Sequence, residues 1–277
     1  MKKDITVEDF GDGYAILGDS TDPNLIRYVR DNLVSSSGLI VTDPPYGNIV
    51  NEKWDKVKIK DTDFSEWMIG WTKEWSDNLL DEGGAFYVWG GIGTPLFRPF
   101  LRYMHDVEVR GKFELANLIT WKKRRGYGVQ NNYLFTREEC AYFIKGNAKK
   151  PKKFNIPLLD EKRGYAGYNP KYPAKSEYFR RSNVWTDINE IFQGKVHPTQ
   201  KAQKLIEVVI EVHTDPGEWV IDPFAGGGTS AFAARKLGRK FLIVEREKEY
   251  FETLVKNLRV ESQVGAVQSG EENSHDK

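Results

Sequence analysis

Apolar residues along the chain follow two repeating patterns. Continuous apolar runs such as "LIVT" (residues 39–42) are short, are bounded by glycine or proline, and are typical of buried strands. Other stretches, such as residues 22–34, repeat their apolar residues at the spacing of one helix face. The runs predict strands at residues 13–19, 39–42, 85–89, 115–121, 140–145, 219–223 and 240–245. The periodic stretches predict helices at residues 22–34, 64–79, 96–104, 200–213, 228–237 and 247–260, with Gly83 and Gly84 ending the second one.

The alternation of strands and helices predicts the fold class. Such a pattern is typical of a doubly wound, mostly parallel α/β sheet of Rossmann-like form, with helices on both faces. A chain of 277 residues is long enough for one such domain with an insertion. The pattern is lost between residues 146 and 187, which are rich in Lys, Arg, Tyr, Pro and Gly. We therefore predict two halves of one domain at 1–145 and 188–260, an insertion at 146–187, and a disordered polar tail at 261–277.

Composition narrows the setting of the protein. The mean hydropathy is −0.58 and no long apolar run occurs, which argues against a membrane span. The start "MKKDITVEDF" has no apolar segment of the kind found in secretory signals. Cys140 is the only cysteine, so no intramolecular disulfide can form, and the four histidines are too scattered for a zinc site. We therefore expect a cytoplasmic protein without a bound metal.

Charge is unevenly distributed along the chain. The net charge is only +1, yet residues 145–181 contain eleven Lys or Arg against three Asp or Glu, a local excess of +8. The stretch "GYAGYNPKYPAKSEYFRRS" (residues 164–182) also places aromatic residues between cations, a mixture that suits phosphate contacts and stacking on bases. A solvated or core-packed loop is the alternative. The predicted DNA-binding residues are Lys149, Lys150, Lys152, Lys153, Arg163, Lys171, Arg180 and Arg181, extended by Lys122, Arg124 and Arg125 of "WKKRRGYG".

A glycine-rich turn, "VIDPFAGGGTSAFAA" (residues 220–234), lies between a predicted strand and a predicted helix. The glycines fit a dinucleotide-binding fingerprint, and the absence of a following lysine excludes a P-loop. Asp222 precedes them, and a carboxylate there would repel a pyrophosphate but would suit a positively charged group. Glu245 ends the next strand, where an acid can accept both ribose hydroxyls, and Asp19 could accept a hydrogen bond from an adenine amine. Together these acids indicate S-adenosylmethionine, although each alone could be a helix N-cap.

The stretch "TDPPYG" (residues 42–47) follows another predicted strand and suits methylation of a base amine. The lone pair of such an amine is delocalised into the ring, so acceptors at its two N–H groups are needed to direct it toward the methyl group. Asp43 can supply one acceptor and the Pro44 carbonyl the other, while Pro45 stiffens the turn. Tyr46 can stack on a base taken out of the duplex. A rigid turn with Asp43 as a cap is the alternative.

Together with "HPTQK" (residues 197–201), "TDPPYG" and "DPFAGGGT" resemble the DNA amino-methyltransferases of the β-class. The resemblance covers most of residues 13–258 and implies a circularly permuted, Rossmann-like methyltransferase fold. It makes 1–145 the catalytic half and 188–260 the cofactor-binding half. It also implies that Thr199 and Lys201 lie near the methionine carboxylate of the cofactor. The implied catalytic residues are Asp43, Pro44, Pro45 and Tyr46, and the other implied cofactor-binding residues are Asp19, Asp222, Phe224, Gly226 and Glu245.

The resemblance also implies partners. In this class a variable target-recognition region lies between the two halves, which is where the basic insertion at 146–187 falls. Double-stranded DNA is therefore the expected substrate, and a homodimer and a cognate restriction enzyme are compatible with the resemblance. Two departures from the family pattern are Ala202, where proline is usual, and Gly227, where a serine is usual. Neither removes a functional group.

Several reactions compete for this set of residues. The Asp43 form of the turn resembles adenine-N6 enzymes, with N4-cytosine methylation as the alternative. Methylation of cytosine carbon 5 needs a reactive thiolate, whereas Cys140 falls within a predicted strand and is expected to be buried. An NAD-dependent dehydrogenase would explain the glycines and Glu245 but not Asp222 or the Asp-Pro-Pro-Tyr turn. A non-catalytic DNA-binding protein would explain only the basic insertion.

Overall fold

The computed structural model describes residues 5–45, 61–90, 97–128, 130, 131, 133–163, 176–189 and 201–272. Within these ranges the side chains of 61–63, 97, 125, 127 and 262–272 are outside the description. In the described part of the chain, one sheet of nine strands runs in the order β1-β2-β11-β10-β3-β4-β6-β5-β9. Its strands are β1 (Thr6–Asp9), β2 (Gly13–Leu17), β3 (Ser37–Thr42), β4 (Leu80–Gly90), β5 (Phe113–Tyr127), β6 (Phe135–Lys145), β9 (Val184–Trp185), β10 (Trp219–Asp222) and β11 (Lys240–Glu245).

The centre of the sheet is parallel. Strands β2, β11, β10, β3 and β4 pair in parallel, while β6 is antiparallel to both β4 and β5, and β1 is antiparallel to β2. The last two strands of the sequence, β10 and β11, lie between β2 and β3. The predicted doubly wound, mostly parallel sheet is therefore confirmed, and the strands latest in the sequence complete its middle.

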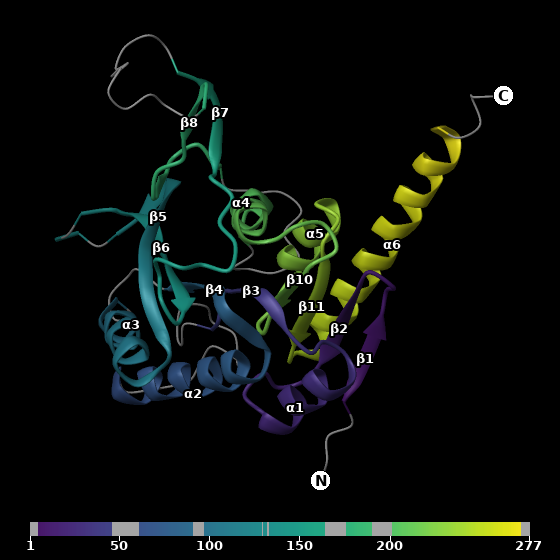
Figure 1. Ribbon diagram of the computed structural model, residues 1–277, viewed down its shortest axis with the longest axis horizontal. Coiled ribbons are helices and arrows are strands. Elements are labelled where there is room, and N and C mark those ends of the chain that lie inside the picture. Colours follow the sequence, from purple (N-terminus) through teal and green to yellow (C-terminus); the bar gives the residue numbers. More distant parts are fainter. Residues whose placement is uncertain are drawn as a thin grey trace.

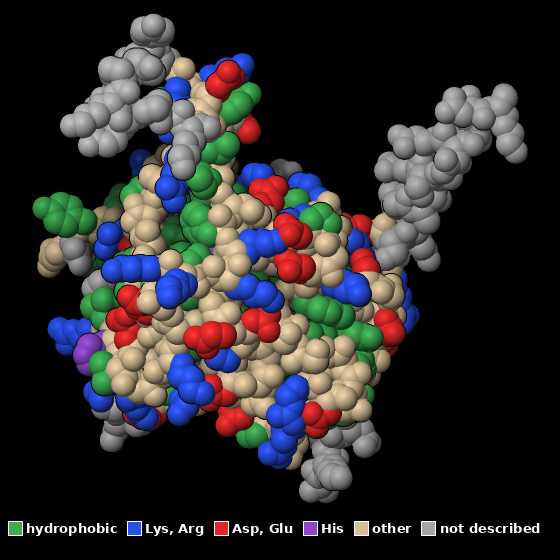
Figure 2. All heavy atoms as spheres, in the orientation of Figure 1, with side chains coloured by type: hydrophobic (Ala, Val, Ile, Leu, Met, Phe, Trp, Pro, Cys, Tyr) green, Lys and Arg blue, Asp and Glu red, His purple; other side chains and the backbone are tan. Residues whose placement is uncertain are grey.

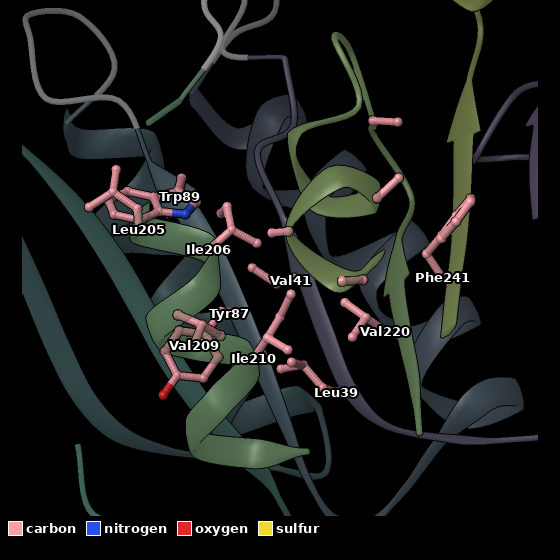
Figure 3. Close-up of a cluster of buried hydrophobic side chains, with 14 of the residues drawn as sticks. Leu39, Val41, Tyr87, Trp89, Leu205, Ile206, Val209, Ile210, Val220 and Phe241 are labelled. Atoms are coloured by element: carbon pink, nitrogen blue, oxygen red, sulfur yellow. The ribbon is translucent and has the colours of Figure 1, made fainter. Parts of the chain in front are cut away.

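Helices cover both faces of this sheet (Figure 1). Helices α1 (Pro23–Asn32), α2 (Asp61–Leu79) and α3 (Phe97–Arg110) pack on one face. Helices α4 (Gln203–His213), α5 (Thr229–Lys236) and α6 (Lys248–Glu272) pack on the other. Figure 3 shows the second core, where apolar residues of α4 face those of β3 and β10. Because the central strands are buried on both faces, they appear in the sequence as continuous apolar runs.

The register between β3 and β10 positions the functional turns. Val220 pairs with Leu39 and Ile221 with Ile40. Each strand ends one or two residues later, so the turn that follows β3 and the turn that follows β10 leave the same edge of the sheet. In open α/β sheets this carboxyl edge is where ligands bind.

Some predicted boundaries were wrong. Helix α2 ends at Leu79, and Gly83 and Gly84 lie inside β4 instead of ending the helix. The register of β3 with β4 shifts between Ser37 and Leu39, and Gly83 has a φ of +73° at this irregularity. Strands β5 and β6 also extend beyond the predicted runs, because their outer ends carry charged residues and so lack the apolar pattern of a buried strand.

The insertion and the tail both contain regular secondary structure. Within the insertion, β7 (Leu158–Lys162) and β8 (Tyr178–Arg180) form a separate two-stranded sheet that projects from the body beyond β5 and β6 (Figure 1). Helix α6 continues to Glu272, and the predicted disorder of the tail at 261–277 stays a prediction. The packed first turns of α6 supply a nucleus, and extending an existing helix is easier than starting one. Among the described residues no helix is long and apolar enough to cross a membrane.

Candidate active site

The turns that follow β3 and β10 meet at the carboxyl edge of the sheet. The Thr42 hydroxyl donates a hydrogen bond of 2.7 Å to Oδ1 of Asp222. A pocket of about 60 Å³ is lined both by Asp43 and by the glycine-rich turn. Its polar and glycine lining is Thr42, Asp43, Lys201, Asp222, Gly226, Gly227, Thr229 and Ser230. Two motifs far apart in the sequence therefore form one pocket.

Asp222 fastens the glycine-rich turn in place. Its Oδ1 accepts a second hydrogen bond, of 3.0 Å, from the backbone N–H of Phe224, and its Oδ2 accepts one of 2.6 Å from Ser230. Burial raises the pKa of Asp222 to about 6, although these three donors act in the opposite direction. Both oxygens are thus engaged within the protein, and the predicted contact of Asp222 with a cofactor stays a prediction.

The glycine-rich turn keeps its backbone open toward the pocket. Gly226 has a φ of +51° and Gly228 a φ of +78°, a region of backbone conformation that favours glycine. Gly228 is the N-cap of α5, and a Cβ at this position would overlap Leu254 of α6. The backbone N–H of Gly226 donates to Oε2 of Glu245 at 2.9 Å, which ties the turn to the end of β11.

Glu245 and Asp19 complete a row of acids along the same edge. Oε1 of Glu245 accepts a 2.7 Å hydrogen bond from the N–H of Glu247, and burial raises the pKa of Glu245 to about 7. Asp19 follows β2, the strand beside β11, and its Oδ1 accepts hydrogen bonds from the N–H and hydroxyl of Thr21 at 2.9 and 2.7 Å. The neighbouring Ser20 hydroxyl donates to the Pro223 carbonyl, so the turns after β2 and β10 are joined.

These residues fit an adenosyl cofactor that carries positive charge. Three carboxylates lie at the ends of adjacent strands, and the glycine backbone between them has no side chain to obstruct a ligand. Phe224 is held against α2, with its ring 4.9 Å from Trp71 and 5.9 Å from Trp67 between centroids. The individual cofactor contacts of Asp19, Phe224, Gly226 and Glu245 remain predictions.

Lys201 occupies a place that the sequence did not indicate. Its Nζ lies 2.7 Å from Oδ2 of Asp43 and 2.9 Å from Oε2 of Glu138, and 5.5 Å from the centre of the Trp89 ring. The side chain is buried. The predicted role of Lys201 at the cofactor carboxylate stays a prediction. In the structure, Lys201 contacts Asp43 in the turn that follows β3. The sequence analysis missed Glu138 and Trp89. Glu138 could have been noticed as an acid just before the predicted strand at 140–145, and Trp89 as an aromatic residue at the end of the predicted strand at 85–89.

Opposite charges in this cluster favour the ionised forms of Lys201 and Glu138. Burial alone would lower the pKa of Lys201, but the carboxylates of Asp43 and Glu138 raise it above the ordinary lysine value. Burial would raise the pKa of Glu138, but Lys201 and Lys123 hold it below its ordinary value. Lys123 of β5 forms an ion pair with Glu138. Negative and positive side chains therefore alternate in a row that begins at Asp43 after β3 and ends on β5. The row is Asp43, Lys201, Glu138 and Lys123.

The remaining catalytic predictions are only partly covered. Asp43, Pro44 and Pro45 are described and follow β3 directly, whereas Tyr46 and Thr199 lie outside the described residues. Cys140 is fully buried in β6, as predicted, and burial raises the pKa of its thiol well above the ordinary value. A buried thiol that resists ionisation does not suit attack on a cytosine ring.

The predicted DNA-binding lysines of residues 149–153 lie away from the pocket. The N–H of Lys152 donates to the Gly83 carbonyl at 2.7 Å, and its ammonium group is 2.7 Å from Asp81. Lys153 forms ion pairs with Asp215 and Glu218. Gly83 lies near the amino end of β4. Gly38 lies near the amino end of β3 and is close to the Lys152 side chain. These lysines, including Lys149 and Lys150, therefore belong to the edge opposite Asp43.

A second group of predicted DNA-binding residues lies on or beside β7, β8 and β5. Arg163 donates to the Tyr178 carbonyl at 2.9 Å, and the Arg180 guanidinium lies 5.6 Å from the Phe154 ring centre. Arg181 forms a bidentate ion pair of 2.7 Å with Asp187. Lys122 and Arg124 are exposed on β5, while Lys171 and the Arg125 side chain lie outside the described residues. Figure 2 shows Lys and Arg side chains interleaved with Asp and Glu over the visible face of the body.

Comparison with known proteins places these features in a family context. A family model described as DNA methylase matches residues 38–256. The type II methyltransferase M2.DpnII of Streptococcus pneumoniae is 28% identical over 250 residues, covering 82% of this chain and 84% of the relative. The DNA adenine methyltransferase YhdJ of Escherichia coli K12 is 26% identical over 251 residues, covering 83% and 79%.

Two solved structures of DNA methyltransferases are also similar to this chain. The M1.HpyAVI–SAM complex aligns with a TM-score of 0.61 and 25% identity, over 88% of this chain and 98% of that one. The cytosine-N4-specific PvuII DNA methyltransferase aligns with a TM-score of 0.66 over 88% of this chain and 85% of that one. At 19% identity the second match indicates a shared fold.

Proposed function

Because the chain belongs to the DNA methylase family, we propose that it transfers a methyl group from S-adenosylmethionine to the N6 amine of adenine in double-stranded DNA. The observation that carries this proposal is the joining of the two turns through Thr42 and Asp222. Asp43 and the glycine-rich turn both line one pocket, which supports the proposal. A methyl donor and a base amine must meet in such a place for an in-line displacement.

The chain contributes position and charge to this reaction. When bound, S-adenosylmethionine supplies a methyl group that its sulfonium has already activated. Asp43 and the Pro44 carbonyl accept the two N–H groups of the target amine and so direct its lone pair toward the methyl group. Neither proline has an N–H that would compete for these acceptors. Glu245 and Asp19 hold the adenosyl part through its hydroxyl and amino groups.

The choice of adenine rests on the acid in the catalytic turn. Asp43 resembles the turn of adenine-N6 enzymes, and one relative is named a DNA adenine methyltransferase. The alternative is the N4 amine of cytosine, because the same two acceptors would serve that amine equally well. The N4 amine is also the target named for the PvuII enzyme, which shares the fold.

We assign DNA contact to the cations on the projecting part of the insertion and on the neighbouring strand β5. Arg163 and Arg180 lie on or beside β7 and β8, and Lys122 and Arg124 are exposed on β5. Lys152 and Lys153 are less suited to this role, since their ammonium groups are paired with body carboxylates. The cytoplasm is the proposed location. A homodimer and a cognate restriction enzyme remain proposals that rest on family resemblance.

Analysis of the methylated base tests this assignment. Unmethylated DNA is incubated with the protein and S-adenosylmethionine labelled in its methyl group, and the DNA is then digested to nucleosides for mass spectrometry. Label in N6-methyladenine is expected. Label in N4-methylcytosine would replace adenine by the alternative base, and DNA binding without any label would support a non-catalytic binding protein instead.

A further inference from the structure

Lys201 connects the catalytic turn to the antiparallel part of the sheet. It directly precedes α4, whereas Asp43 follows β3 and Glu138 lies on β6. Its ammonium group is within 3 Å of a carboxylate oxygen of each. A buried ammonium group is costly unless it is paired with opposite charge, so Lys201 must keep its contacts with these two carboxylates.

We propose that Lys201 is a positioning residue for Asp43: with Glu138 as its anchor, it fixes the direction in which the Asp43 carboxylate faces the target amine. The inference rests on the proposed function of Asp43. A carboxylate that follows a strand can rotate about its side-chain bonds, and only some of its orientations can accept an N–H of the base. The 2.7 Å contact with a lysine that is itself held from a second side restricts that rotation.

Glu138 makes the position of Lys201 definite. A lysine with one carboxylate partner would follow any movement of that partner, because its four-carbon chain is flexible. Here the second carboxylate belongs to Glu138 of β6, an internal strand in which Glu138 pairs with Trp121 of β5, and it also forms an ion pair with Lys123. The ammonium group is thus tied to the rigid sheet, and Asp43 is tied to the ammonium group.

This role differs measurably from binding of the cofactor carboxylate. A lysine that bound the cofactor would change cofactor affinity when replaced, whereas a residue that orients Asp43 changes the methyl-transfer step. The two roles therefore separate in steady-state kinetics, the first acting on KM for S-adenosylmethionine and the second on kcat.

The pH profile gives a second distinction. Among the described residues, the charged or titratable groups in the surroundings of Asp43 include Lys201, Asp222 of β10, and Glu138 and Cys140 of β6. Lys201 is the cation among these, so its loss would leave Asp43 beside two other carboxylates. Asp43 would then take up a proton more readily, and the acidic limb of the kcat profile would move to higher pH.

Replacement of Lys201 by methionine tests the proposal. Lys201→Met keeps a chain of similar length without the charge, and Lys73→Met on the exposed side of α2 is the matched control. We expect kcat to fall about 100-fold, the acidic limb to shift to higher pH, and KM for S-adenosylmethionine to change less than about 3-fold. Unchanged kcat, or a change confined to KM, would overturn the inference.

A double variant distinguishes positioning from simple charge balance. Lys201→Met/Glu138→Gln removes one cation and one anion, so the net charge of the cluster is unchanged, whereas the single variant leaves it one positive charge short. If Lys201 positions Asp43, the double variant stays as slow as Lys201→Met. Recovery to the wild-type rate would mean that Lys201 only neutralises Glu138 and would refute the proposal. Wild-type protein that transfers no methyl group would instead count against the proposed function.

Discussion

Glu245 and Asp222 show how similar side chains take different tasks at the same edge of the sheet. Asp222 uses both oxygens to hold Thr42, Ser230 and the N–H of Phe224, so it maintains the shape of the pocket. Glu245 accepts two backbone N–H groups, yet burial still raises its pKa to about 7. Burial therefore disfavours the ionised form of Glu245, and hydrogen bonds from the two ribose hydroxyls of an adenosyl cofactor would favour it.

Cofactor affinity is therefore expected to depend on pH through Glu245. The folded protein without cofactor has a Glu245 pKa of about 7, whereas binding of two hydroxyl donors favours the ionised form. Affinity should thus be highest above pH 7 and should fall as the pH drops below 7, by roughly 10-fold between pH 8 and pH 6. Titration calorimetry measures this directly, and Glu245→Gln should flatten the dependence. Equal affinity of the wild type at both pH values would contradict the role given to Glu245.

The same raised pKa values affect stability without cofactor. An unfolded Glu or Asp ionises near pH 4, but Asp222 and Glu245 do so at about 6 and about 7 in the folded protein. The folded state therefore holds more protons between pH 4 and pH 7, and the contribution of these two groups to stability falls as the pH rises through that range. Cofactor binding should offset this loss.

The glycine-rich turn and helix α5 form the element on which the pocket depends most. Gly228 caps α5 with a φ of +78°, and its missing side chain lets Leu254 of α6 pack closely. Gly238 follows the same helix with a φ of +70°, but a Cβ there would make only an ordinary contact with Pro216. The two glycines share a backbone conformation and differ in the space around them.

This pair permits a matched stability experiment. Gly238→Ala should lower the free energy of unfolding by about 1 kcal/mol, because alanine is strained at a positive φ. Gly228→Ala adds overlap with Leu254 and should cost roughly 1–3 kcal/mol more. Denaturant titration measures both. Equal losses in the two variants would mean that the α5–α6 packing tolerates a side chain at the turn.

The sequence predicts the buried elements better than the exposed ones. Strand β11 (Lys240–Glu245) was predicted with its observed limits, because its apolar run at residues 241–244 lies between two charged residues. Gly83 and Gly84 were misassigned, since glycine in a strand irregularity has the same sequence signal as glycine after a helix. The contact of Lys201 with Glu138 could not be predicted, because it depends on how β6 and the start of α4 meet in the folded sheet.

The distribution of charge over the molecule is also more specific than the sequence alone suggested. Among the described residues, the cations that give residues 145–181 their +8 excess do not form one surface. Lys149–Lys153 lie at the amino ends of β3 and β4, whereas Arg163 and Arg180 lie on the projecting pair β7 and β8. DNA that presents a base to Asp43 must approach the carboxyl edge of the sheet. Lys152 lies at the other edge, near the amino ends of β3 and β4.

Salt-dependent DNA binding separates these two groups. Arg163→Ala/Arg180→Ala should weaken DNA binding and reduce the slope of log affinity against log salt by about 2, because each lost phosphate contact removes close to one unit. Lys152→Ala/Lys153→Ala is the matched control and should leave the slope nearly unchanged. The reverse order of effects would place the DNA on the other edge of the sheet.

The central claim is that Asp43 and the glycine-rich turn serve one methyl-transfer pocket. The most direct measurement compares wild type and Asp43→Ala for transfer of labelled methyl groups to DNA, with cofactor affinity determined in parallel by calorimetry. We predict that transfer falls by about 1000-fold or more, because the target amine loses an acceptor, while the cofactor Kd changes less than about 3-fold, because the proposed adenosyl contacts come from the ends of β2, β10 and β11 and the turns that follow them. Full transfer activity in Asp43→Ala would contradict it.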